Sequence, residues 1–308
     1  MIHPLFHPTT AILVDEHKPF LNNLNLNGEI LYQTFEDPAS ALIYCLEKSP
    51  LNLVSPSSEI LNPHRFDTVS VIVLNCSHPI QFIDKLKENI NGQFVKIILV
   101  TDKADQNEAI ALFSAKKIDK FFLKTETSLE ESIKQAITDM QQAYFADVGQ
   151  SIFKTVMNPL FKEEAFLNFF SKILQKLQIC EYYFCDNIDS FILVDREGNP
   201  HVLVLRSKGD LAFSAEYARI HQVYSELVNR ISIGRLIPFF DNANPTPAKM
   251  EDWIIHTHHA KKIEGTEAYY YAVLSGKKTA VLPCTQNIKG FAAVVAKENL
   301  PIIESKYR

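Results

Sequence analysis

Short apolar runs alternate with longer amphipathic stretches in the first part of the chain. The apolar runs are AILVDEH from residue 11, EILYQTFED from 29, SVIVLNC from 70, VKIILVT from 95 and KFFLKT from 120. Segments of helix length lie between them, and several open on a proline or on a capping serine or aspartate. Buried apolar runs joined by helices are typical of βαβ units. We therefore expect an α/β domain with a doubly wound, five-stranded parallel sheet.

The helices expected between these runs cover residues 18–26, 38–49, 78–90 and 106–117. Asp37 followed by Pro38 is a strong helix start, because proline suits the first helical turn. The connection over residues 49–66 is longer than the others and is rich in Ser, Asn and Pro. We expect a long loop there, either a tolerated surface insertion or a functional segment.

An apolar stripe at intervals of three or four residues follows the last run, and this spacing predicts a long helix. Its members are Leu129, Ile133, Ile137, Met140, Tyr144, Val148, Ile152 and Val156. Asn158-Pro159 ends the stripe, and a second amphipathic helix follows, with Phe166, Phe169, Phe170, Ile173, Leu174 and Leu177 on its apolar face. We expect a long helical linker over 128–179. The stripe over 129–156 belongs either to a core or to the seam of a homodimer.

Short strands dominate beyond residue 180. The strand-like runs are EYYFCD, SFILVD, HVLVLRS, EAYYYAVLS and GFAAVVA. SFILVDREGNPHVLVL predicts a hairpin with Gly198 and Asn199 at its turn, and a helix is expected over 214–231. The chain is thus expected to divide into a first domain over 1–127, the linker, and an α+β domain with an antiparallel sheet over 180–308.

The bulk composition narrows the class of protein. A chain of 308 residues has room for two domains, and 46% hydrophobic with 22% charged residues is ordinary for a globular protein. The net charge of −5 gives no positive field for nucleic acid, and no apolar stretch approaches the length needed to span a bilayer. Five cysteines without a CxxC pair fit a reducing compartment. We expect a cytoplasmic protein that binds neither DNA nor a membrane.

Polar side chains stand at the ends of four of the predicted parallel strands. The first strand ends with Asp15 and Glu16, the third with Asn75, the fourth with Thr101 and the fifth with Lys124. The carboxyl ends of parallel strands meet at one edge of the sheet, where such folds place their sites. Two adjacent acids suit Mg²⁺, and a lysine with a threonine suits a phosphoryl group. We expect the candidate site at this edge.

The order and spacing of these residues resemble the receiver domain of response regulators of two-component systems, of the chemotaxis, flavodoxin-like type. The resemblance implies that the two acids match the metal-binding acids of the family. It also implies a hydroxyl residue that senses a phosphoryl group, a lysine of the phosphorylation site and a switch aromatic. The matching positions are Asp15, Glu16, Thr101, Lys124 and Phe121.

Three departures stand out within this resemblance, which covers residues 11–142. Asn75, four residues before Pro79, stands where the family has its phosphoacceptor aspartate, and an amide cannot form an acyl phosphate. Asp102 replaces the usual small residue after the threonine, and Thr125 replaces the usual proline after the lysine. We expect a degenerate receiver pocket without phosphotransfer chemistry. It requires no cofactor, and Mg²⁺ binding at the remaining acids is left open.

The second half resembles, less specifically, the output region of a group of atypical response regulators. FILVDREGNP after a helix pair and AYYYAVL near the end carry this resemblance. It implies signalling without naming an activity, and no basic recognition helix and no GGDEF- or HD-like motif is present. We expect a response-regulator-like signal transduction protein that acts through a protein partner or by sensing a noncovalent ligand.

A regulated enzyme is the alternative. Its C-terminal domain would bind or hydrolyse a nucleotide or another small molecule, and sequence order allows several polar groups to meet in space. These are Asp195, His221, His256 and Glu267.

Two other clusters are read as structural. The histidines of IIHTHHAKK, at 256, 258 and 259, lack an acid or cysteine at metal-ligand spacing and are expected in a polar loop. Cys180 and Cys185 are expected to be structural thiols rather than a redox pair.

Overall fold

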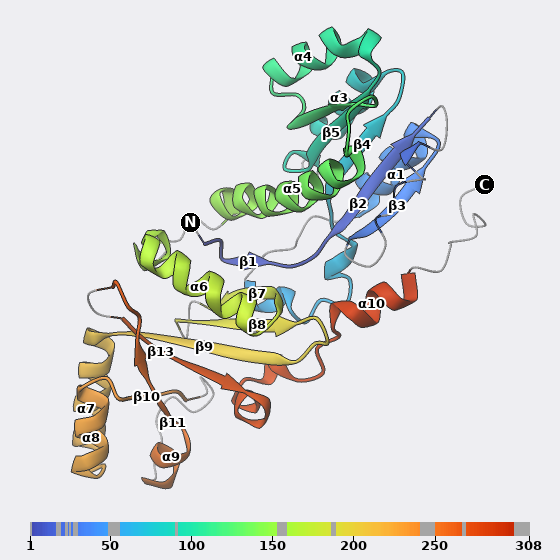
Figure 1. The fold of residues 1–308 in the computed structure, drawn as a ribbon. Coiled ribbons are helices and arrows are strands. Elements are labelled where there is room, and N and C mark those ends of the chain that lie inside the picture. Colours follow the sequence, from blue (N-terminus) through green and yellow to red (C-terminus); the bar gives the residue numbers. More distant parts are fainter. Residues whose placement is uncertain are drawn as a thin grey trace. The chain divides into compact units, whose positions relative to one another are not determined.

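The computed structural model describes residues 2–16, 20, 21, 24, 26, 30–48, 56–89, 92–152, 159–185, 189–240, 250–266 and 269–298. The chain divides into two compact units (Figure 1). The five-stranded unit comprises Phe6–Val54, Asn62–Lys154 and Ala293–Arg308. The six-stranded unit comprises Met1–Leu5, Ser55–Leu61 and Thr155–Ala292.

The five-stranded unit contains the parallel sheet that the sequence predicts. Its strands lie in the order β3-β2-β4-β5-β6, and every neighbouring pair is parallel. The strands are β2 (Thr10–Asp15), β3 (Leu31–Phe35), β4 (Val69–Asn75), β5 (Lys96–Thr101) and β6 (Lys120–Leu123). Every residue of β2 and β4 is buried, which explains their continuous apolar runs. The prediction of a doubly wound α/β sheet is confirmed.

Helices pack on both faces of this sheet. The helices are α1 (Pro38–Glu47), α3 (Pro79–Glu88), α4 (Gln106–Ser114) and α5 (Leu129–Ile152), with a 3₁₀ turn η4 (Lys103–Asp105) before α4. Alternate residues of β4 enter opposite cores: Ile72 and Leu74 face α1, α3 and α4, while Val71 and Val73 face α5. Asp37 caps α1 through the amides of residues 39 and 40, as its position before Pro38 predicts.

The apolar stripe is core packing from Leu129 to Val148, and its last member, Val156, lies outside the described residues. Ile133, Ala136 and Ile137 are fully buried against the sheet, and Tyr144 and Val148 are buried further along the helix. The outward positions carry polar side chains, among them Glu131, Gln135, Thr138, Asp139 and Gln142. The helix is therefore part of the five-stranded unit.

Two expected connections are described only in part. The helix expected over 18–26 falls largely outside the described residues. The segment expected as one long loop, 49–66, is described from residue 56, where it contains the short helix α2 (Pro56–Glu59) and the turn η2 (Arg65–Asp67). Its α2 packs on β7, a strand of the six-stranded unit.

The six-stranded unit is an α+β structure with an antiparallel sheet, as expected. Its strands lie in the order β1-β7-β8-β9-β13-β12, and the neighbours from β7 to β12 pair antiparallel. They are β1 (Leu5–Phe6), β7 (Ile179–Cys185), β8 (Ser190–Asp195), β9 (Pro200–Ser207), β12 (Lys261–Lys262) and β13 (Tyr269–Ser275). The turn η5 (Pro159–Lys162) and the helix α6 (Glu164–Lys176) supply the buried rings of Phe161, Phe166 and Phe170 to its core.

The expected boundaries at residues 127 and 179 differ from the compact units. Both helices placed in the linker enter a core, α5 in one unit and α6 in the other. The first five residues and Ser55–Leu61 join the six-stranded unit.

The hairpin between β8 and β9 is confirmed. Asp195 Oδ1 accepts hydrogen bonds from the amides of Glu197 and Asn199, at 3.0 and 2.8 Å. Gly198 has φ of 93°, a conformation that glycine adopts without strain.

Two other expectations for this half are wrong. The single helix over 214–231 is two helices, α7 (Lys208–Ile220) and α8 (Ser225–Ser232), because Gln222 takes a positive φ of 56° between them. The run GFAAVVA lies in a helix, α10 (Phe291–Glu298), since a short apolar run does not separate strand from helix and alanine favours the helix.

The remaining elements of this unit are short. They are β10 (Leu236–Pro238), α9 (Met250–Ile255), β11 (Thr257–His259), η7 (Gly276–Val281) and η8 (Pro283–Thr285), with β10 and β11 forming a separate two-stranded sheet. Among the described residues, no helix combines the length and apolar character needed to cross a membrane.

Candidate functional site

Four of the residues singled out from the sequence, Asp15, Asn75, Thr101 and Lys124, lie at the carboxyl ends of the parallel strands. Asp15 ends β2 and is the register partner of Asn75, which ends β4. Thr101 ends β5, and the amide of Lys124, just beyond β6, donates to the carbonyl of Thr101 at 3.0 Å. The doubly wound topology thus gathers these groups at one edge.

Asp15 and Asn75 are joined by a short hydrogen bond. Asn75 Nδ2 donates to Asp15 Oδ1 at 2.6 Å, and the two residues are only 7% and 3% exposed. The amide of Leu21 donates to the other carboxylate oxygen, Asp15 Oδ2, also at 2.6 Å. Both oxygens of this buried carboxylate therefore have donors, which is the condition for burying such a group.

Glu16 connects the end of β2 to the loop after β4. Its backbone amide donates to the carbonyl of Asn75 at 3.0 Å, and its exposed side chain accepts a hydrogen bond from the amide of Ser77 at Oε2, at 2.7 Å. The second acid of the pair thus also has a donor from within the chain.

Lys124 forms an ion pair with Asp102. Its Nζ lies 2.9 Å from Asp102 Oδ2, and it stands 6.0 Å from the centroid of the Phe20 ring. The Lys124 side chain is 23% exposed and that of Asp102 is 63% exposed. Asp102 follows the buried Thr101 directly, so the pair lies beside the hydroxyl residue of the pocket.

Phe121 and Cys76 complete the surroundings. Phe121 is half-buried and meets Phe113 of α4 edge to face, with 6.0 Å between the ring centroids. Burial raises the pKa of the Cys76 thiol to about 11, with a smaller contribution from the charge of Glu16. The thiol next to Asn75 is therefore not a nucleophile at neutral pH.

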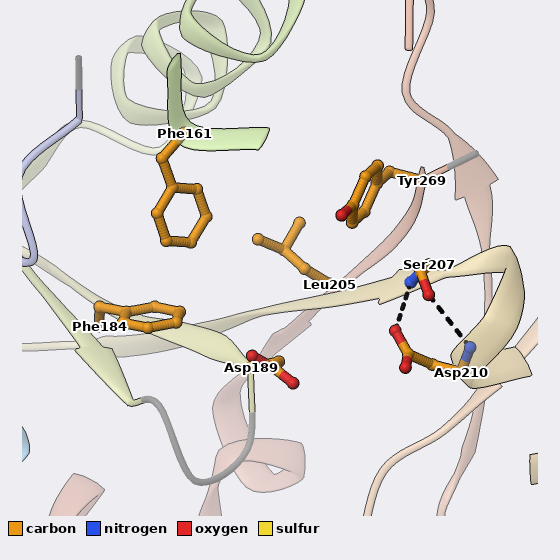
Figure 2. Close-up of a pocket in the computed structure, with 7 residues that line it drawn as sticks. All are labelled: Phe161, Phe184, Asp189, Leu205, Ser207, Asp210 and Tyr269. Atoms are coloured by element: carbon orange, nitrogen blue, oxygen red, sulfur yellow. Dashed lines mark hydrogen bonds between the residues drawn. The ribbon is translucent and has the colours of Figure 1, made fainter. Parts of the chain in front are cut away.

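A hollow lies in the six-stranded unit, and Figure 2 shows the side chains that line it. They are Phe161, Phe184, Asp189, Leu205, Ser207, Asp210 and Tyr269. Ser207 and Asp210 form the capping box of α7, since each side chain accepts from the other residue's amide. Sequence reasoning missed this hollow, because its lining residues come from separate elements and share no motif.

The residues of the enzyme alternative are not joined to one another. Asp195 holds the β8–β9 turn, His221 stacks on Tyr217 with 4.4 Å between centroids, and His256 meets Phe240 at 5.8 Å. No hydrogen bond or ion pair links these three within the described part of the chain, and Glu267 lies outside it.

The other clusters show no metal or disulfide chemistry. Over the ranges that the structure covers, no three His, Cys, Asp or Glu side chains gather closely enough to hold a metal ion. All five cysteines are free, and burial raises the pKa of the Cys180 thiol to about 12. Burial lowers the pKa of His258 to about 4, with smaller contributions from Lys278 and His256.

Comparison with known proteins gives a match that extends over nearly the whole chain. No protein-family model and no curated protein matches the chain. The Legionella pneumophila response regulator LqsR is 25% identical, covers 96% of this chain and 96% of its own, and has a TM-score of 0.81.

Matches to shorter stretches of the chain include receiver domains. A CheY-like one from Methanospirillum hungatei JF-1 is 10% identical over 46% of this chain and 98% of its own, with a TM-score of 0.34. The receiver domain of a sensor histidine kinase from Pseudomonas aeruginosa PAO1, solved with magnesium in its cleft, is 15% identical over 45% of this chain and 98% of its own, at 0.28.

The likeness to LqsR extends over both units of the chain. The resemblance of the chain to a response regulator, with a receiver-like five-stranded unit, is thereby confirmed. The chain is a response-regulator-like signalling protein.

Proposed function

We propose that the five-stranded unit is a pseudo-receiver, which passes on a signal without being phosphorylated at Asn75. The observation that carries this proposal is the amide at the end of β4, in a pocket that keeps Asp15, Thr101 and Lys124. Forming an acyl phosphate requires a carboxylate oxygen as the nucleophile. The amide nitrogen of Asn75 is a hydrogen-bond donor to Asp15 and offers no such nucleophile.

The hydrogen bonds at this edge support a structural pocket. The Asn75 amide satisfies a buried carboxylate, and Lys124 satisfies the neighbouring carboxylate of Asp102. A phosphoryl group at position 75 would have to displace both arrangements. These two contacts therefore fix the side chains of Asn75 and Lys124 in place without a phosphoryl group.

A protein partner is the proposed means of output. Ile110 and Phe113 of α4 are 44% and 49% exposed, and Phe113 lies against the half-buried Phe121. Exposed apolar side chains beside the family's switch aromatic suit a protein contact. With a net charge of −5, DNA is not the proposed partner, and the proposed location is the cytoplasm.

A homodimer through residues 129–156 remains a prediction, but its contact would have to use the polar face of α5. The apolar stripe of α5 is used inside the five-stranded unit, so a second copy would meet the polar face of the helix. Mass measurement in solution for the native chain and for a Gln135→Glu, Gln142→Glu variant tests this contact. A dimer that dissociates in the variant supports it, and a native monomer contradicts it.

The experiment that tests the pseudo-receiver uses a small phosphodonor with Mg²⁺. The native chain, an Asn75→Asp variant and an ordinary aspartate-bearing receiver are incubated side by side, and bound phosphoryl groups are detected by radiolabel. We expect label on the ordinary receiver and on the Asn75→Asp variant, and none on the native chain. Stable label on the native chain at this pocket would contradict the proposal that it is a pseudo-receiver.

A further inference from the structure

We infer that the pocket at the carboxyl edge of the parallel sheet is not a Mg²⁺ site, because the Asn75–Asp15 hydrogen bond takes the place that a bridging metal would need. This inference rests on the proposed function, since it concerns the same degenerate pocket. Contacts within the chain, rather than a metal, then hold the residues of this pocket in place.

The side chains that end β2 and β4 lie too close together to hold a Mg²⁺ ion between them. A Mg²⁺ ion shared by the residues that end β2 and β4 binds each oxygen at about 2.0–2.1 Å in octahedral geometry. The ion then lies between the two side chains. In this pocket the space is closed by a direct contact of 2.6 Å between Asn75 Nδ2 and Asp15 Oδ1.

The side-chain amide of Asn75 presents its nitrogen, and not its oxygen, to Asp15. An ionised carboxylate only accepts hydrogen bonds, so the atom 2.6 Å from Asp15 Oδ1 is the amide nitrogen. The amide oxygen, the atom of Asn75 able to ligate a metal, points away. Turning it toward a metal would leave Oδ1 of the 3%-exposed Asp15 without this donor.

Two other carboxylate oxygens at this edge also accept hydrogen bonds from within the chain. Asp15 Oδ2 accepts from the amide of Leu21, and Glu16 Oε2 accepts from the amide of Ser77. Only two carboxylates stand at this strand end, and Mg²⁺ gives up its water shell reluctantly. A metal would have to compete with a donor on each of them.

The charge balance agrees with these contacts. Lys124 is paired with Asp102, whose carboxylate lies 2.9 Å from Nζ. Asn75 is neutral, so the ends of β2 and β4 have one carboxylate fewer than the resemblance to receivers implies, and the added carboxylate of Asp102 is held by Lys124. The pull on a divalent cation is reduced accordingly.

The same geometry predicts that one substitution creates a metal requirement. Asn75→Asp puts a second carboxylate oxygen in place of the nitrogen that lies 2.6 Å from Asp15 Oδ1, and two such charges repel. Mg²⁺ between them would relieve the repulsion and stabilise the folded variant by mass action. Asn107→Asp is the matched control, because it adds the same charge at an exposed position of α4.

Thermal unfolding with EDTA and with millimolar Mg²⁺ tests this inference. We expect the midpoint of the native chain and of Asn107→Asp to be the same in both buffers. The Asn75→Asp midpoint should lie below the native one in EDTA and rise by about 3 °C or more with Mg²⁺. A native midpoint that rises with Mg²⁺ as much as that of Asn75→Asp overturns the inference, as does an Asn75→Asp midpoint that ignores Mg²⁺.

Calorimetric titration of the native chain with Mg²⁺ gives a second measurement, which does not depend on the variant folding. No saturable binding in the millimolar range is expected, and one site per chain that is lost in Asp15→Asn contradicts the inference. The outcome is separate from that of the phosphodonor experiment. A native chain that binds Mg²⁺ without taking up a phosphoryl group overturns this inference alone, and a labelled native chain overturns the proposed function.

Discussion

The ammonium group of Lys124 lies 2.9 Å from a carboxylate oxygen of Asp102, the residue that directly follows Thr101. The resemblance to receiver domains implies that this lysine serves the phosphorylation site. It also implies a small residue directly after the threonine, where this chain has Asp102. Here the additional acid gives the lysine a partner that does not depend on position 75. Two of the departures from the family pattern, at 75 and 102, thus belong together physically.

Replacing Asp102 should have little effect on stability. The Asp102 side chain is 63% exposed, and exposed ion pairs contribute about 0–1 kcal/mol. We expect Asp102→Asn to lower the free energy of unfolding by less than about 1 kcal/mol, with a smaller difference at high salt. Urea unfolding at low and high salt measures this. A loss of several kcal/mol would show that the pair is part of the core of the pocket.

His7 should make stability depend on pH. It is fully buried, its Nδ1 hydrogen bonds to the carbonyl of Pro8 at 2.9 Å, and its ring lies 4.8 Å from that of Phe145. Burial lowers its pKa from 6.5 to about 3, and the charge of Arg65 adds a smaller effect. Below pH 6.5, His7 therefore binds a proton in the unfolded chain and does not bind one in the folded chain.

The sign follows from this proton uptake. Stability should fall as the pH drops from 6.5 toward 3, by roughly 2 kcal/mol between pH 7 and pH 5 from His7 alone. His7→Gln should flatten this part of the pH profile, which urea unfolding at several pH values measures. An unchanged slope in His7→Gln would show that other groups cause it.

Phe191 should be a large contributor to the six-stranded unit. It is fully buried on β8, and its ring centroid lies 5.3, 4.8 and 5.0 Å from those of Phe161, Phe170 and Phe184. Phe191→Ala should lower the free energy of unfolding by about 3–5 kcal/mol. The control is Phe213→Ala on α7, where the ring is 74% exposed, and its effect should stay within about 0.5 kcal/mol. Equal losses in urea unfolding would contradict the assigned core.

Gly198 should tolerate no side chain. Its φ is 93°, and an added Cβ would lie 2.7 Å from the backbone nitrogen of Gly290 and 2.9 Å from the carbonyl oxygen of Ile288. We expect Gly198→Ala to cost about 2 kcal/mol or more. Gly209→Ala is the control, because the nearest atom is Ser207 Oγ at 3.5 Å in the first turn of α7, where alanine favours the helix. A Gly198→Ala protein as stable as the control would argue against this packing of the hairpin.

The parallel sheet could be predicted because two of its strands are buried on both faces. Such strands read as unbroken apolar runs, as VSVIVLN does in β4. The strand β1 could not be predicted, because its two residues carry no periodic pattern. The helix α10 was mistaken for a strand, since FAAVVA is too short to show a period.

The placement of the candidate residues at one edge was predictable, and their contacts were not. Strand order alone brings Asp15 and Asn75 to one edge, and the structure pairs them in register. The donor from Leu21 to Asp15 depends on the course of the chain after β2, which no motif encodes. The partner of Lys124 depends on side-chain reach across the edge, and the sequence shows only that Asp102 adds an acid nearby.

The intact mass of the native chain after incubation with a small phosphodonor and Mg²⁺ shows whether the chain can be phosphorylated at position 75. We expect an unchanged mass, because Asn75 provides no carboxylate oxygen to hold a phosphoryl group. An ordinary receiver in the same experiment should gain the mass of one phosphoryl group. A stable gain of one phosphoryl group by the native chain, mapped to the peptide that contains residue 75 or to Asp15, would contradict the account.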